Sequence, residues 1–112
     1  MSLIDKIRAS REVSGVEADG RKFTIRRPTD EEANNFSNGD VSMLSVVKRF
    51  TTGWDLAEID IIPGGGPVSV PFDIDLFCEW VADQPKIWVP LGDAILSAYK
   101  AHIDAREAAE KN

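Results

Sequence analysis

Few residues of this chain have side chains that could carry out catalysis, and they stand apart from one another. The single histidine, His102, has no cysteine nearby, and no Ser, Asp or Glu lies at a spacing typical of a catalytic triad or a zinc site. We interpret His102 as a residue on the surface of a helix. The single cysteine, Cys78, lies between Phe77 and Trp80 in an apolar helical pattern, which indicates a buried small apolar residue. These residues predict a protein that is not an enzyme.

Two further motifs look like ligand sites but lack the required context. Residues 29–32, Thr-Asp-Glu-Glu, place three acids together at a helix start. Such carboxylates fan around the helix axis, so we interpret them as capping residues and not as a metal cluster. Residues 63–67, Pro-Gly-Gly-Gly-Pro, have no strand before them and no Gly-Lys-Ser/Thr after them, so they predict a mobile turn and not a phosphate loop. We expect no cofactor and no metal.

The charge of the chain is divided unevenly along its 112 residues. Residues 1–28 hold seven Lys or Arg against four acids, a net +3, whereas residues 29–112 hold six against fifteen, a net −9. A protein that binds nucleic acid usually has the opposite balance, so we expect no nucleic-acid partner. The acidic part suits either a solvated surface or the attraction of a basic or amphipathic polypeptide.

Length and composition predict one domain over residues 1–112. A single cysteine excludes a framework of disulfides and favours a reducing cytoplasm. The chain has no apolar run long enough to span a membrane, and residues 1–10 lack the apolar centre of a signal peptide. We therefore expect a soluble cytoplasmic protein that does not bind a membrane.

The N-terminal part predicts a helical arm followed by a β-hairpin. Residues 1–10 have apolar residues at helical spacing, and residues 13–27 change to a period of two. Asp19-Gly20 is a two-residue turn that favours positive φ at both positions. Counting outward from this turn pairs Ala18 with Arg21, Glu17 with Lys22 and Val16 with Phe23, and Gly15 is a candidate bulge.

Residues 29–104 predict a helical body, which makes the fold α+β and mainly helical, with a short hairpin followed by about four helices. Thr29 and Glu32 form a capping box for a short helix that stops near Asn38-Gly39. Asp40 then caps a helix with a wide apolar face. Gly53 is expected to end that helix in a left-handed conformation, so that Trp54 returns to the core.

After an irregular connection over residues 55–70, two more helices are expected. Asp73 caps the first of them, and Phe72 and Phe77 form a hydrophobic staple. Pro85 ends that helix, Trp88 anchors the turn, and Pro90 occupies the first turn of the last helix. Residues 105–112 are polar and predict a frayed tail. The predicted structural anchors are Trp54, Phe72, Phe77 and Trp88.

One apolar stripe of the last helix is the predicted binding surface. Leu96, Tyr99 and Ile103 lie on it, and an aromatic residue between two aliphatic ones suits the centre of an interface. We expect this stripe to contact a partner or a second copy of the chain, so that the protein forms a homo-oligomer.

Several segments in this order resemble the tail assembly chaperones of long-tailed bacteriophages. They are Phe-Thr-Ile-Arg-Arg-Pro-Thr-Asp-Glu-Glu at 23–32, Val47 through Gly53-Trp54-Asp55, Pro67 to Phe72, and Leu91 through Ala94-Ile95 and Ala98-Tyr99. The resemblance covers about residues 21–103, whereas the triglycine turn and the N-terminal arm depart from the family pattern. It implies a non-catalytic factor, encoded by a phage or prophage, that acts in the cytoplasm of the bacterial host. Such a factor binds the tape measure protein, keeps it soluble while the tail tube assembles, and is absent from the mature virion.

The family resemblance also implies a second, longer product made by a ribosomal slip near the stop codon. Glu110-Lys111-Asn112 can be encoded by codons that contain a slippery heptamer, and the appended segment would recruit tail tube protein. Two other classes of protein stay open. A structural tail or neck component would also be small, acidic and non-catalytic, and an acidic inhibitor could mimic nucleic acid.

Overall fold

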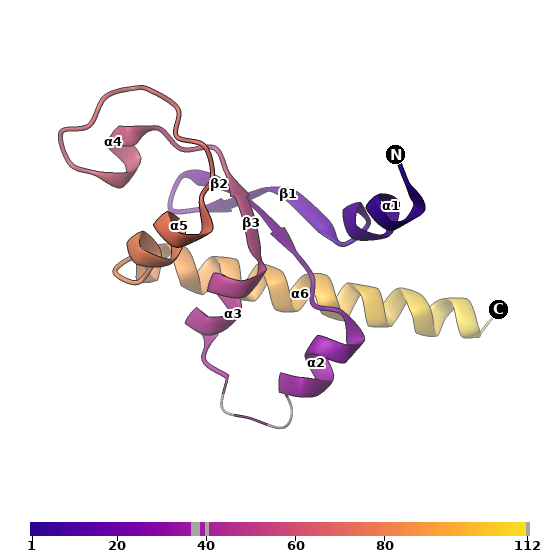
Figure 1. The fold of residues 1–112 in the computed structure, drawn as a ribbon. Helices are drawn as coiled ribbons and strands as arrows, with labels where there is room; N and C mark the ends of the chain where they lie inside the picture. The colour runs from indigo at the N-terminus through magenta and orange to yellow at the C-terminus, as the bar shows by residue number, and fades with distance from the viewer. Residues whose placement is uncertain (37–38, 40, 112) are drawn as a thin grey trace.

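The computed structural model describes residues 1–36, 39 and 41–111, and it has the expected α+β fold, mainly helical (Figure 1). One three-stranded antiparallel sheet lies against the long last helix. The elements in chain order are α1 (Leu3–Ala9), β1 (Glu12–Ala18), β2 (Arg21–Arg26), α2 (Asp30–Phe36), α3 (Met43–Phe50), β3 (Thr51–Trp54), α4 (Glu58–Ile61), α5 (Ile74–Val81) and α6 (Pro85–Glu110).

The hairpin of β1 and β2 has the predicted register. Ala18 pairs with Arg21, Glu17 with Lys22 and Val16 with Phe23. Asp19 and Gly20 both have positive φ, at 50° and 76°, as a two-residue turn of this kind requires. The register shifts between Val13 and Val16, and Gly15 has a φ of 70°, so the predicted bulge at Gly15 is confirmed.

The prediction that Gly53 ends a helix in a left-handed conformation is wrong. The helix α3 ends at Phe50, and Gly53 belongs to β3, which pairs with β2. Gly53 lies opposite Thr24, and a Cβ atom at position 53 would be 3.3 Å from the Thr24 Cβ. A glycine is therefore favoured here by the close approach of the Thr24 side chain on the neighbouring strand and not by a positive φ.

The predicted start of the last helix is also wrong. Pro85 takes the first helical position, and α6 continues through Pro90 without interruption. Buried residues on both sides, Ile87 and Leu91, hold this part of α6 in one helix. Pro90 has no N–H to donate to the carbonyl of Lys86, and Lys86 is an exposed residue at which water can supply that hydrogen bond. Trp88 accordingly lies within α6 and not in a turn.

The end of α6 differs from the expected frayed tail. The helix runs to Glu110, and the Lys111 N–H donates to the carbonyl of Glu107 at 3.2 Å. Figure 1 shows this last part of α6 extending beyond the sheet toward the C-terminus. The helix therefore ends several residues later than its polar pattern suggested.

Helix caps follow the local sequence where the structure describes them. Thr29 and Glu32 form the predicted capping box, with N–O distances of 3.0 and 3.1 Å. Asp73 caps α5 by accepting from the Asp75 N–H at 2.9 Å. Ser42 caps α3, whereas the cap predicted at Asp40 lies outside the described residues, as does Asn38 of the predicted helix stop.

The connection between β3 and α5 is more regular than the sequence indicated. It contains the short helix α4 and an isolated bridge between Ala57 and Ser69. The triglycine turn folds back on α4: the Ile59 N–H donates to the Gly66 carbonyl at 3.0 Å. A Cβ atom at Gly65 would lie 2.8 Å from the backbone of Glu58. The glycines therefore permit the turn to pack closely against the backbone of α4. The sequence predicted a mobile turn and did not indicate this packing.

The core lies between the sheet, α3, α5 and α6. Its buried apolar residues are Ala18, Phe23, Ile25, Val46, Val47, Phe50, Leu56, Phe77, Val81, Ile87, Leu91 and Ile95. Partly buried aromatic rings pack against this core, and they include Trp54 of β3, Trp80 of α5 and Phe72 of the segment before α5.

Candidate partner-binding surface

An apolar groove lies where α2, α3 and α6 meet. Its lining residues are Phe36, Gly39, Val41, Met43, Val46 and Leu96, and its volume is about 240 Å³. Leu96 is 47% exposed and Val41 is 41% exposed, although both side chains are apolar. The volume is below the roughly 300–1,000 Å³ of typical small-molecule pockets, so the groove suits the side chains of a polypeptide better than a metabolite.

The wall formed by α3 depends on a close crossing of α3 and α6. Gly92 is buried in α6, and a Cβ atom there would overlap the Sδ and Cγ atoms of Met43. The missing side chain at position 92 therefore makes the space in which Met43 lies. Ser42, which caps α3 through the Ser45 N–H at 3.1 Å, fixes the start of the same helix. The local sequence thus determines where Met43 enters the groove.

The three residues of the predicted binding stripe separate into different environments. Leu96 lines the groove and is exposed. Tyr99 and Ile103 are half-buried, and the Tyr99 hydroxyl donates to Asp30 Oδ1 at 3.0 Å. Tyr99 therefore contributes to the contact between α6 and α2, while Leu96 remains available to a partner.

Asp30 joins the first turn of α2 to three side chains of α6. Besides Tyr99, its carboxylate contacts His102 Nε2 at 3.4 Å and accepts a hydrogen bond from Arg106. The hydrogen bond from Arg106 lowers the pKa of Asp30, while burial and Asp30 raise the pKa of Tyr99. His102 thus faces a carboxylate of another helix and is only partly on the surface, which its position in the sequence did not indicate.

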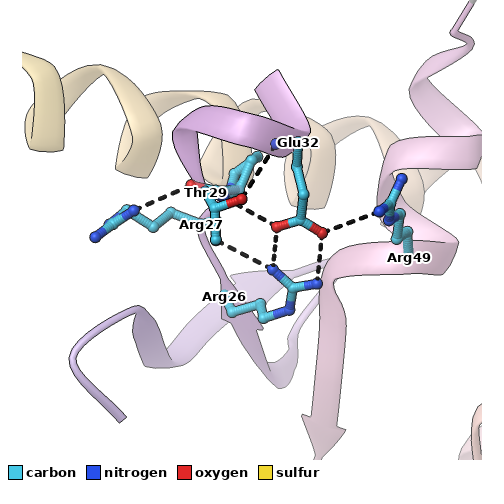
Figure 2. A network of polar contacts seen from close by, with 6 residues as sticks. Arg26, Arg27, Thr29, Glu32 and Arg49 are labelled. Atoms are coloured by element: carbon cyan, nitrogen blue, oxygen red, sulfur yellow. Dashed lines mark hydrogen bonds and ion pairs between the residues drawn. The ribbon is translucent and has the colours of Figure 1, made fainter. Parts of the chain in front are cut away.

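A second network surrounds Glu32, which lies in the same helical turn as Asp30 (Figure 2). Arg26 donates to both of its carboxylate oxygens, at 2.8 and 3.0 Å, and Arg49 lies 3.1 Å from Oε2. The Arg26 hydrogen bond is the main cause that lowers the pKa of Glu32 from 4.5 to about 2. Sequence reasoning found the capping box but missed both arginines, because Arg26 lies in β2 and Arg49 in α3.

A hollow of about 530 Å³ lies over this network, and its lining is of mixed charge. Arg8, Arg11, Glu12 and Glu31 line it together with the residues of the Glu32 network. Four arginines and three glutamates line it, and two of the arginines are already paired with Glu32. The hollow therefore lacks the excess of one charge that would recruit an anion or a cation.

The predicted anchors lie at the core or against it. Phe77 is buried, and Trp54, Phe72 and Trp88 are partly buried and pack on the core. The centroids of the Phe72 and Phe77 rings are 5.7 Å apart, so the predicted staple is present. The Trp54 indole N–H donates to the Val70 carbonyl at 2.7 Å. Trp80 was not predicted as an anchor, but its ring centroid lies 6.0 Å from that of Trp54.

Within the described part of the chain, no group of three or more His, Cys, Asp or Glu side chains could hold a metal ion. Cys78 is free and half-buried. None of the described helices is long and apolar enough to cross a membrane. The groove beside Leu96 is lined mainly by apolar side chains, two of which, Val41 and Leu96, are exposed.

Comparisons of the chain with models of protein families, with curated protein sequences and with solved structures find no match.

Proposed function

We propose that this protein is a bacteriophage tail assembly chaperone, a non-catalytic factor that binds the tape measure protein and keeps it soluble during assembly of the tail tube. Two independent arguments support the proposal. The sequence resembles that family over about residues 21–103. The groove beside Leu96 offers apolar surface to a partner, and this is the observation that carries the structural part of the argument.

The groove suits a helix with apolar residues on one face. An amphipathic helix binds such a groove through anchors spaced three and four residues apart. The exposed side chains of Leu96 and Val41 would cover these anchors and exclude water from them. Residues 29–112 have a net charge of −9, which adds attraction for a basic partner but leaves the apolar contact dominant. We therefore expect moderate salt to weaken the complex only in part.

The same proposal places the protein in the cytoplasm of the bacterial host and outside the finished virion. A longer product made by a ribosomal slip would carry its extra segment after residue 112. Because α6 leads the chain away from the sheet, such a segment would start far from the core and could recruit tail tube protein without disturbing it (Figure 1).

Coexpression tests the proposal. If the gene next to this one encodes a very long helical protein, that protein is the partner to coexpress, and the readout is its soluble fraction after lysis. We expect the wild-type chain to keep the partner protein soluble. Leu96→Asp should abolish most of this increase in the soluble fraction, because a charge in the groove must be desolvated on binding. Val68→Asp is the matched control, since Val68 is 69% exposed and belongs to the connection after α4.

Two results would contradict the chaperone function. A partner that remains soluble when expressed alone needs no chaperone. Detection of this chain in purified virions at the copy number of tail components would support the structural alternative, because an assembly chaperone leaves before maturation.

A further inference from the structure

The helix α1 presents an apolar face that the rest of its own chain does not cover. Leu3, Ile4 and Ile7 are 77%, 54% and 53% exposed, and α1 has no buried residue. The helix is nevertheless capped, because Ser2 accepts from the Asp5 N–H at 3.2 Å. Ordered apolar side chains that stay in water are a feature of surfaces that bind a partner.

The chain cannot fold this helix into its own groove. Only Ser10 and Arg11 join α1 to β1, and the Arg11 carbonyl accepts from the Arg27 N–H at 2.9 Å, which fixes the joint to the sheet. Two residues reach about 7 Å at most. Leu96 lines the groove, whereas Ser10 and Arg11 line a separate hollow with Ala98 and Ala101, so the joint of α1 lies against a different face of α6, and a helix is about 10 Å wide. A second molecule must therefore supply the surface that covers α1.

The groove beside Leu96 matches α1 in size, in polarity and in charge. Leu3 and Ile7 are one helical turn apart, about 6 Å, so a groove of about 240 Å³ takes them without needing a long helix. Lys6 and Arg8 flank the apolar residues of α1 and have no ion pair with any described residue. Asp93, which is exposed one turn before Leu96 on α6, offers them an opposite charge.

We infer that α1 of one molecule binds in the Leu96 groove of a second copy of this chain. The contact joins two different surfaces, so the copy that gives its α1 keeps a free groove and the copy that receives it keeps a free α1, and further copies add head to tail. The inference rests on the proposed function, because that function uses the same groove to bind the tape measure protein. A tape measure helix that binds the groove would therefore displace α1. Its test uses this chain alone, so one proposal can fail while the other stands.

Complementation between two disabled variants tests this geometry. The arm variant carries Ile4→Asp and Ile7→Asp and keeps its groove, whereas the groove variant carries Leu96→Asp and keeps its α1. Sedimentation equilibrium is measured for each variant alone, for their equimolar mixture and for the wild type. Because so small a contact is weak, concentrations should extend to about 1 mM. Val68→Asp is the control for an added surface charge.

The wild type and the Val68→Asp control should gain mass steadily with concentration, and each variant alone should stay at the monomer mass of 12.3 kDa. The mixture should rise to twice that mass and stop there, because the one working arm then fills the one working groove. A wild type that stays monomeric, an arm variant that still associates, or a mixture that does not pair would overturn the inference. Titrating unlabelled groove variant into arm variant labelled at its methionine methyl groups gives a second readout, since the Met43 signal must shift if α1 enters the groove.

Discussion

The guanidinium of Arg26 holds both carboxylate oxygens of Glu32 and also lies 4.5 Å from the centroid of the Phe50 ring. The same carboxylate caps α2 and contacts Arg49. One acidic side chain, 15% exposed, therefore connects β2, α2 and α3. Because Phe50 is fully buried, the network fixes the polar edge of the core at which α2 begins and α3 ends.

Glu32→Gln should destabilise the protein by about 1–3 kcal/mol, because the amide cannot accept two charge-assisted hydrogen bonds from Arg26. Urea unfolding at neutral pH measures this loss. Glu31→Gln is the matched control, since Glu31 is exposed and adjacent in the same helical turn. An equal loss in both variants would mean that the effect comes from charge at the helix start and not from the Arg26 contact.

The stability of the wild type should depend on pH through Glu32. Its pKa is about 2 in the folded protein against 4.5 in the unfolded chain, so the folded state favours the ionised form. The contribution of this group is fully present above about pH 5 and is lost as the pH falls from 4.5 toward 2. Subtracting the urea unfolding profile of Glu32→Gln from that of the wild type should reveal this decline. A difference that stays constant over that pH range would contradict the assigned shift.

Trp54→Ala should lower stability by about 3–5 kcal/mol, because the ring packs on the core between Phe72 and Phe77. Trp54→Phe keeps an aromatic ring but removes the hydrogen bond to the Val70 carbonyl, so it should cost about 1 kcal/mol from that source. Thermal unfolding of both variants separates the two contributions. An unchanged melting temperature for Trp54→Ala would show that Trp54 does not stabilise the core, and it would assign this residue to a binding surface.

Gly92→Ala should destabilise the crossing of α3 and α6 by about 1–3 kcal/mol, although alanine favours a helix over glycine. The new methyl group must displace Met43, with which it overlaps. The double variant Gly92→Ala/Met43→Ala should therefore lose less stability than the sum of the single variants, with a coupling of roughly 0.5–3 kcal/mol. Ser97→Ala, at an exposed position of α6, controls for helix propensity. Additive losses would show that Met43 can move aside freely.

Asp30→Asn should loosen the C-terminal half of α6, because it removes the charge that Arg106 and His102 face. Hydrogen exchange of the amides over residues 99–110 should speed up, while exchange in β2 should stay unchanged. Asp104→Asn is the control, since among the described residues Asp104 has its ion pair within α6, with Lys100 at 3.6 Å. The pKa of Asp30 is lowered in the fold, so acidification below its folded value should produce the same loosening in the wild type.

Features that depend on residues a few positions apart could be predicted from the sequence. The register of the hairpin follows from the φ preferences of Asp19-Gly20, and each later pair is fixed by counting from that turn. The Thr29–Glu32 capping box and the Asp73 cap depend on contacts within one helical turn. These interactions form locally, so their residue types and spacing carry the information.

Features that depend on distant segments were decided by the tertiary structure. Gly53 is a strand residue because β3 pairs with β2. The helix α6 continues through Pro90 because buried residues before and after Pro90 belong to the same core. The pairing of Asp30 with Arg106 spans 76 positions, and no local pattern encodes it. The groove likewise forms where α2, α3 and α6 meet. In this arrangement Leu96 is exposed, whereas Tyr99 contacts Asp30. Helical spacing places both residues on one stripe, but the packing of other helices determines which side of that stripe is covered.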